Sequence, residues 1–136
     1  MALIQPYLTF NGNCAEAMNF YKEVFGGELM IQKFGDAPME TTPESKDRIM
    51  HARLQNGDLI LMASDGMPGQ APIQGTNVTI SVQSASKEDQ EKYFHKMAEG
   101  GKVTMPLADT FWGAYFGMLT DKFGMHWMFN TEHKQK

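Results

Sequence analysis

His51 is the side chain in this sequence best suited to acid–base chemistry, because an imidazole changes its protonation state near neutral pH. Residues 48–55 alternate in polarity as a strand does, which places His51 on the same face as Ile49 and Arg53. On a face that lines a cavity, His51 would serve as a general acid or base. The alternative is a histidine satisfied by neighbouring backbone groups, and the sequence shows no partner for the ring.

Asp65 and His126 are further polar candidates for a binding site. Asp65 follows the predicted strand 58–64 and precedes Gly66, where a carboxylate can hold a polar ligand, orient His51 or form an Asx-turn. His126 has the strand parity of Met128, so it either faces a cavity as a polar group or lies at a strand edge.

Cys14 lies at the expected N-terminus of a helix, where the positive end of the helix dipole favours a thiolate and lowers the thiol pKa. It is the one cysteine of the chain, so it cannot form an internal disulfide. A redox role is therefore not favoured, and a reducing compartment is expected.

Aromatic side chains gather in a glycine-interrupted segment that contains Phe111, Trp112 and Tyr115. Such rings often form the wall of a binding cavity, and Trp112 and Tyr115 are candidate ligand-binding residues for that reason. Packing in the core explains the same pattern equally well.

The first half of the chain is predicted to contain one helix and four strands. Asn13 is the expected helix N-cap with Glu16 three positions later, and Gly26-Gly27 ends the helix. Apolar residues recur along it at helical spacing: Ala17, Met18, Tyr21, Val24 and Phe25. The strands are expected at residues 4–10, 28–35, 48–55 and 58–64, with a tight hairpin at Asn56-Gly57 between the last two.

The second half repeats this order of elements. A strand at 76–84 precedes a helix that Ser86 caps and Gly100-Gly101 ends, and three strands follow at 102–108, 115–120 and 125–130. The chain is thus predicted to be an α+β protein of two tandem βαβββ modules, about 1–66 and about 76–131, within a single domain of residues 1–136. Together the modules are expected to form a cupped eight-stranded sheet around a cavity.

The first strand of each module is expected to turn one face to its helix and the other into the cup. The polar residues of those second faces are the remaining candidates for ligand binding: Gln5, Tyr7, Thr9, Asn77 and Thr79.

Composition excludes several classes of function. The net charge is −4 and no basic stripe occurs, which argues against nucleic acid as a partner. Neither a signal peptide nor an apolar stretch long enough for a membrane span is present, so we expect a cytoplasmic protein without membrane association.

Several short motifs occur in order along the whole chain: Tyr7-Leu8-Thr9-Phe10-Asn11-Gly12-Asn13, Ile49-Met50-His51-Ala52, Ser64-Asp65, Phe111-Trp112, and Asp121-Lys122-Phe123-Gly124 followed by Trp127. With the duplicated module, they resemble the PhnB-like branch of the vicinal oxygen chelate superfamily, which includes glyoxalase I, dioxygenases and bleomycin-resistance proteins. Older labels for this branch include 3-demethylubiquinone-9 3-methyltransferase. No strand, glycine-rich turn and helix of the kind that holds a methyl donor supports that label here.

The resemblance also implies where a metal ion would bind. Metal-dependent relatives use one His, Gln or Glu from the first and last strand of each module. These positions correspond here to Gln5 (or Pro6 if the register slips), Leu61 or Met62, Asn77 and Met128. Aliphatic and thioether groups cannot replace the water around a hard divalent cation. We therefore expect neither a metal nor another cofactor.

The sequence favours a metal-independent protein that binds an unidentified small molecule. Two alternatives stay open: a lyase or isomerase with His51 as general base, and an atypical metal-dependent enzyme resembling glyoxalases or dioxygenases. A homodimer is also expected, because open half-cups expose strand edges and apolar rims. The segments Leu29-Met30-Ile31 and Met125 to Phe129 are the expected contributors to that interface.

Overall fold

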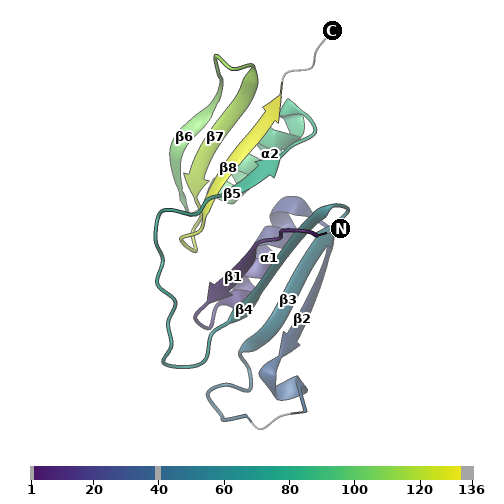
Figure 1. Cartoon of the computed structure of the whole chain (residues 1–136), viewed down its shortest axis with the longest axis vertical. Helices are drawn as coiled ribbons and strands as arrows, with labels where there is room; N and C mark the ends of the chain where they lie inside the picture. The colour runs from purple at the N-terminus through teal and green to yellow at the C-terminus, as the bar shows by residue number, and fades with distance from the viewer. Residues whose placement is uncertain (1, 39–40, 133–136) are drawn as a thin grey trace. The chain divides into compact units, whose positions relative to one another are not determined.

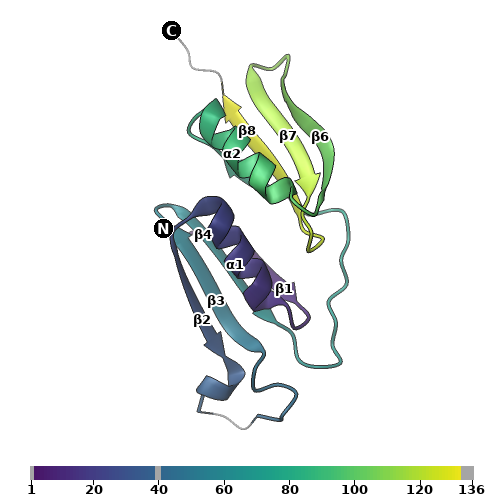
Figure 2. The same ribbon diagram turned by 180° about the vertical axis from the view of Figure 1, so that it is seen from behind.

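A computed structural model describes residues 2–38 and 41–132 of the chain. The chain divides into two compact units, Met1–Ile73 and Gln74–Lys136, which correspond to the two expected modules. Each unit contains a four-stranded sheet. One face of that sheet is covered by an α-helix, α1 in the first unit and α2 in the second (Figures 1 and 2). The α+β class and the two tandem βαβββ modules are thereby confirmed, with one sheet in each unit.

Module one consists of β1 (Tyr7–Phe10), α1 (Cys14–Phe25), β2 (Glu28–Lys33), the 3₁₀ helix η1 (Phe34–Asp36), β3 (Ile49–Asn56) and β4 (Leu59–Asp65). The strands lie in the order β1-β4-β3-β2. β1 runs parallel to β4, whereas β3 pairs antiparallel with both β2 and β4. The expected hairpin between β3 and β4 is present, with Gly57 at a φ of 62°.

Module two consists of β5 (Ile80–Gln83), α2 (Lys87–Ala98), β6 (Lys102–Asp109), β7 (Ala114–Thr120) and β8 (His126–Glu132). Its strand order, β5-β8-β7-β6, and its strand directions reproduce those of module one. The first strand of each module is shorter than predicted. In module one Pro6 has no N–H to donate to a ladder, and only its carbonyl bonds to the sheet, at Met62 N.

The helix stripe predicted in the first half of the chain packs into the core of module one, since Ala17, Met18, Tyr21, Val24 and Phe25 of α1 are buried. In α2 the buried apolar residues are Phe94 and Met97. In module two the rings of Phe94 and Phe129 meet edge to face with their centroids 5.5 Å apart. A side chain at Gly117 would collide with Phe94, so this glycine lets α2 approach β7 closely.

Both helices end in the same kind of close joint with their sheets. Gly27 lies against the carbonyl of Gln55, and Gly101 lies against the carbonyl of Thr120, so that a Cβ atom at either glycine would overlap the facing backbone. The double glycines seen in the sequence are therefore required for this approach as well as for ending the helices.

The two helices begin differently. Ser86 caps α2 as predicted, because its hydroxyl accepts a hydrogen bond from the Asp89 N–H at 3.1 Å. Asn13 occupies the N-cap position of α1, but its side chain makes no capping bond. At the start of α1 the backbone N–H of Cys14 instead donates a hydrogen bond to Asp65, the last residue of β4.

No helix among residues 2–38 and 41–132 combines the length and the apolar character needed to cross a membrane.

Candidate functional site

The sheet of module one has a helix side and an open face. Alternate residues of β3 and β4, including Ala52, Leu54, Leu61 and Ala63, are buried on the side that α1 covers in Figure 2. Strand register places their neighbours on the other side, which we call the open face of module one. Its central residues are Tyr7, Thr9, Met30, Gln32, His51, Arg53, Met62 and Ser64.

Tyr7 and His51 form a pair on this open face. The Tyr7 hydroxyl lies 3.0 Å from His51 Nδ1, within hydrogen-bond distance, and the two rings stack at 5.7 Å with an angle of 27° between their planes. Tyr7 is 47% exposed, so the pair is accessible to a ligand. When the hydroxyl donates this bond, the neutral imidazole carries its proton on Nε2.

The sequence placed His51 on the correct side of β3 relative to Ala52 and Arg53 but wrongly grouped it with Ile49. The register shows why: Gln32 pairs with His51, and the next residue, Lys33, pairs with Ile49. This bulge at Met50 shifts the alternation, so that Ile49 is buried at 3% exposure.

Asp65 lies at the end of β4 and is almost fully buried, at 4% exposure. Its Oδ1 accepts hydrogen bonds from the backbone N–H groups of Gly12, at 2.7 Å, and Cys14, at 3.0 Å. Its Oδ2 accepts one from Ile49 N–H at 2.9 Å. The carboxylate thus joins the start of α1, the end of β4 and the start of β3, and Tyr7, rather than Asp65, orients the His51 ring.

Cys14 is fully buried beneath this junction. Burial, followed by the negative charge of Asp65, raises the pKa of its thiol to about 12. The expectation of a lowered thiol pKa at the helix N-terminus was therefore wrong: desolvation and a neighbouring carboxylate outweigh the helix dipole.

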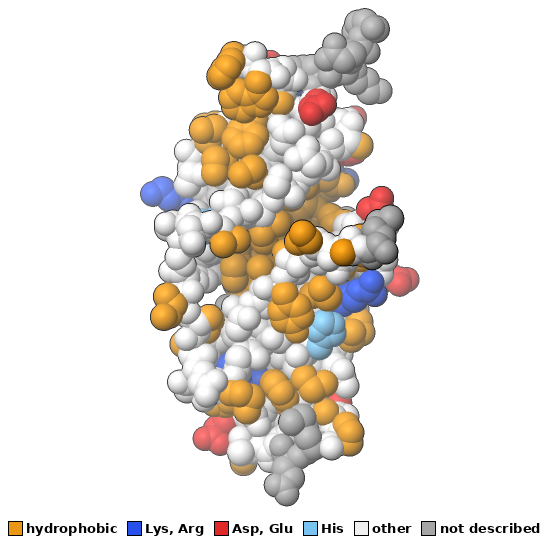
Figure 3. Space-filling model, in the orientation of Figure 1, with side chains coloured by type: hydrophobic (Ala, Val, Ile, Leu, Met, Phe, Trp, Pro, Cys, Tyr) orange, Lys and Arg blue, Asp and Glu red, His pale blue; other side chains and the backbone are white. Residues whose placement is uncertain are grey.

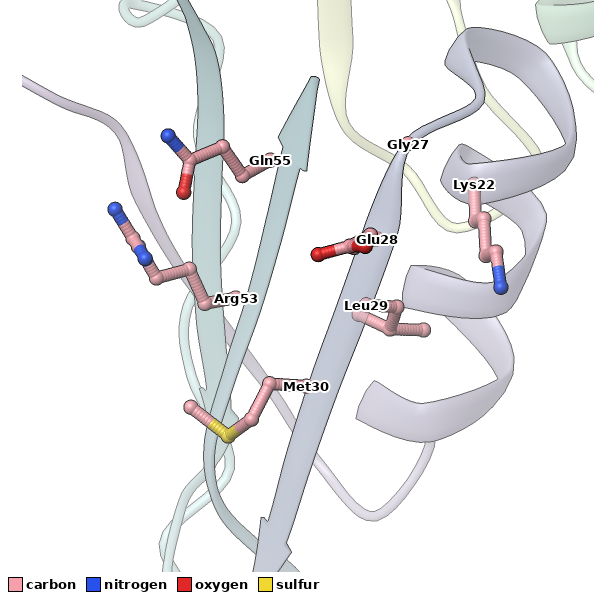
Figure 4. A pocket seen from close by; sticks show the side chains of 7 residues that line it. All are labelled: Lys22, Gly27, Glu28, Leu29, Met30, Arg53 and Gln55. Atoms are coloured by element: carbon pink, nitrogen blue, oxygen red, sulfur yellow. The ribbon is translucent and has the colours of Figure 1, made fainter. Parts of the chain in front are cut away.

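An open hollow of about 500 Å³ adjoins Arg53 at the edge strand β2. In Figure 4, Arg53, Gln55 and Met30 point to one side of the strands, with Glu28 beside them, whereas Leu29 and Lys22 lie on the helix side of β2. The hollow therefore follows the strand edge rather than enclosing a chamber. The sequence analysis missed it, because edge position depends on long-range strand order.

Module two has an open face of a different character. The paired positions Met105, Met118 and Met128 form a row across β6, β7 and β8, and Phe116 lies one row away. Phe111 and Trp112, in the turn between β6 and β7, are 96% and 57% exposed. The Phe111 and Trp112 rings meet edge to face at 5.1 Å, and Trp112 meets Phe116 at 5.9 Å. Hydrophobic side chains accordingly gather over β6 and β7 in Figure 3.

Tyr115 does not join this aromatic group. Register pairs it with Thr131 on the helix side, where its hydroxyl donates to Glu91 Oε2 at 2.9 Å and Lys87 Nζ lies 4.8 Å from its ring centroid. Desolvation, then the hydrogen bond to Glu91 and nearby negative charge, raise the pKa of the Tyr115 hydroxyl. Tyr115 therefore lies on the opposite side of the sheet from Phe116, and its role as a ligand-binding residue stays a prediction.

His126 has the parity of Met128 on β8, as predicted, and both its ring nitrogens are engaged. Nδ1 lies 3.0 Å from Thr120 Oγ1, and Nε2 lies 3.0 Å from the Gly75 carbonyl oxygen. Its visible role is to tie the segment before β5 to the β7–β8 hairpin.

The remaining candidates lie at or before the first strand of each module. Thr9 is an exposed residue of β1, while Gln5 precedes that strand and is half-buried. Asn77 and Thr79 precede β5, and Asn77 is exposed.

The side chains at the positions of a family metal site do not suit a divalent metal ion. Leu61 is buried on the helix side, so Met62 is the residue of that pair on the open face, and Met128 is its counterpart in module two. Two thioethers and the amides of Gln5 and Asn77 include no imidazole and no carboxylate. In the described part of the chain, no group of three or more His, Cys, Asp or Glu side chains is placed to hold a metal ion.

Comparison with known proteins gives the family. The model of the Glyoxalase/Bleomycin resistance protein/Dioxygenase superfamily matches residues 3–129. Protein YjdN of Escherichia coli strain K12 is 33% identical, over 97% of each chain.

Solved structures indicate the same family. Protein PA1353 of Pseudomonas aeruginosa is 47% identical with a TM-score of 0.88, over 98% of this chain and 100% of that one. A PhnB protein of Bacillus cereus, described as a putative 3-demethylubiquinone-9 3-methyltransferase, is 26% identical with a TM-score of 0.77, over 96% and 99%. The chain therefore belongs to the glyoxalase/bleomycin resistance protein/dioxygenase superfamily and, within it, to the PhnB-like branch.

Proposed function

We propose that this protein binds a small organic molecule on the open faces of its sheets and does so without a metal ion. The observation that carries the proposal is the pair of thioethers, Met62 and Met128, at open-face positions where metal-dependent relatives supply ligands. Methionine packs against varied apolar shapes but competes poorly with water for a hard cation. On each module separately, the open face offers side chains that can contact a ligand: polar groups in module one and aromatic rings in module two.

Metal analysis and native mass spectrometry of the purified protein test the proposal together. We expect less than about a tenth of an equivalent of zinc, nickel, iron or manganese. We also expect that neither EDTA nor added metal changes the unfolding temperature, because only a metal that binds the folded state would raise that temperature. We also expect a small-molecule adduct that is lost on denaturation. One equivalent of metal, whose removal lowers the unfolding temperature, would overturn the metal-independent function.

A second candidate function is a lyase or isomerase in which His51 acts as general base. The Tyr7–His51 hydrogen bond favours it, because a second group that orients the ring is typical of acid–base sites. The molecule recovered from the protein decides between the two functions. A molecule returned unchanged after prolonged incubation indicates binding alone, whereas conversion that His51→Gln abolishes indicates an enzyme.

We also propose that the protein works in the cytoplasm, where reducing conditions keep Cys14 as a thiol.

A further inference from the structure

The two arginines of the chain, Arg48 and Arg53, differ in their contacts. Arg48 donates from Nε to the Gly66 carbonyl at 2.6 Å and from an Nη atom to Asn11 Oδ1 at 3.0 Å, so its role is to hold a loop. Within the described residues, the guanidinium of Arg53 makes neither a hydrogen bond nor an ion pair.

The surroundings of Arg53 make this lack of a partner informative. Its strand neighbours on the open face are Met30 in β2 and Met62 in β4, neither of which can satisfy a guanidinium. The side chain is half-buried and borders the hollow at β2. A cation held between two thioethers and facing an open hollow is suited to an anion from outside the chain.

His51 adds a second donor to the same face. It lies two positions from Arg53 on β3, so the Cα atoms of the two residues are about 6.7 Å apart and their side chains point the same way. Because His51 Nδ1 meets the Tyr7 hydroxyl, Nε2 is the ring atom left for a ligand. A hydroxyl that donates to Nδ1 makes Nε2 carry the proton, and Nε2 is then a donor like the guanidinium.

We propose that Arg53 and His51 together bind an oxyanion, the carboxylate or phosphate group of the small-molecule ligand, and that Tyr7 is the positioning residue that keeps the proton on His51 Nε2. This inference rests on the proposed binding function and names the ligand class of module one. The planar guanidinium supplies two parallel N–H donors, and the imidazole supplies a third. Met30 and Met62 flank these donors as adaptable contacts for the apolar remainder of the ligand.

Glu28 is the acidic residue beside this cluster. It is the first residue of β2, pairs with Gln55 of β3 and lines the same hollow as Arg53, yet it forms no ion pair with Arg53 within 4.0 Å. Its charge opposes an incoming anion. Removal of that charge therefore strengthens anion binding if the cluster works as proposed.

Calorimetric titration with benzoate and benzamide, which share a ring and differ in charge, tests the proposal. We expect the protein to bind benzoate at least ten-fold more tightly than benzamide. Arg53→Gln should weaken benzoate binding by at least ten-fold, Arg53→Lys by less, and Glu28→Gln should strengthen it two- to five-fold. Lys92→Gln removes an exposed positive charge from α2 in the other module and should change neither affinity. Circular dichroism establishes that each variant is folded.

Two results would overturn the proposal: benzoate that binds no better than benzamide, including no binding by either, and Arg53→Gln that behaves like Lys92→Gln. If the protein nevertheless retains a small-molecule adduct, the oxyanion site fails while the proposed function stands. If the protein shows neither a small-molecule adduct nor benzoate binding, the oxyanion site and the proposed function are both refuted.

The role of Tyr7 has a spectroscopic test of its own. Long-range proton–nitrogen NMR correlations report which ring nitrogen of His51 carries the proton. We expect the Nε2–H form in the wild-type protein and a mixture of the two forms in Tyr7→Phe, with weaker benzoate binding. An unchanged His51 spectrum in Tyr7→Phe would refute the positioning role.

Discussion

The Asp65 carboxylate accepts a hydrogen bond from the backbone N–H of Cys14 at 3.0 Å, which joins the last residue of β4 to the first residue of α1. Two further backbone donors, Gly12 and Ile49, complete the environment of this carboxylate. One buried side chain thus does for α1 what Ser86 does for α2, from a position 51 residues away in the sequence.

Asp65→Asn is expected to destabilise the protein by about 2–4 kcal/mol, because an amide NH₂ would face a backbone donor in a buried site. Urea unfolding followed by circular dichroism measures this loss. Asp58→Asn in the exposed turn between β3 and β4 is the matched control and should change stability by less than about 0.5 kcal/mol. Equal stability of the two variants would contradict a structural role for Asp65.

The Cys14 thiol is expected to resist alkylation by iodoacetamide at pH 8 in the folded protein and to react fully in urea. Its raised pKa also makes stability depend on pH. The unfolded thiol ionises near its ordinary value of 9.0, whereas the folded thiol keeps its proton to about 12. The stabilisation is therefore fully present below about pH 9 and is lost as the pH rises toward 12. Cys14→Ala should remove this part of the alkaline decline, and rapid alkylation of folded protein would contradict the burial.

The two tryptophans should report on different surroundings. Trp127 is 2% exposed and its indole N–H donates to Asp121 Oδ2 at 2.8 Å, whereas Trp112 is 57% exposed. We expect Trp112→Phe to leave blue-shifted fluorescence that acrylamide quenches only weakly. Trp127→Phe should leave red-shifted, readily quenched emission and lower stability through the lost hydrogen bond and packing. Strong quenching in Trp112→Phe would place Trp127 at the surface.

We propose that the protein is a homodimer, because β2 and β6 each have one side unpaired within the sheet of their module. Met30 on β2 is 46% exposed and is available to such an interface. The other expected segment is less suitable, because Trp127 and Phe129 belong to the core of module two.

Light scattering should give a mass near twice the 15.3 kDa of one chain. Met30→Lys should lower that mass if β2 contributes, since lysine discourages edge-to-edge pairing. Gln74→Lys, in the segment before β5, serves as a charge-matched control. A constant mass of one chain at micromolar concentrations would refute the dimer.

Local patterns in the sequence predicted the elements that depend on local physics. The stripe of α1, the Ser86 cap and the strand expected at 58–64 follow from local spacing, and each is present in the structure. The bulge at Met50 could not be predicted in this way, because it depends on how β3 aligns with β2.

Most of the site also depends on contacts between distant residues. Tyr7 and His51 are 44 positions apart, and they meet because β1 inserts beside β4 in parallel. The same holds for Asp65 and Cys14, whose proximity reversed the expected direction of the thiol pKa. The residue types alone indicated His51 and Asp65 as candidates, whereas the order of the strands determines what each of them contacts.

Neighbouring residues of a strand point to opposite sides of its sheet, so substitutions on an open face leave the helix-side core of that module intact. Selection can therefore alter the chemistry of an open face stepwise, without passing through unfolded intermediates. Duplication supplied two such surfaces on separate cores, and they have already diverged, toward histidine and arginine in one and toward methionine and aromatic rings in the other. This freedom gives a lineage a route to new ligands while its scaffold stays the same.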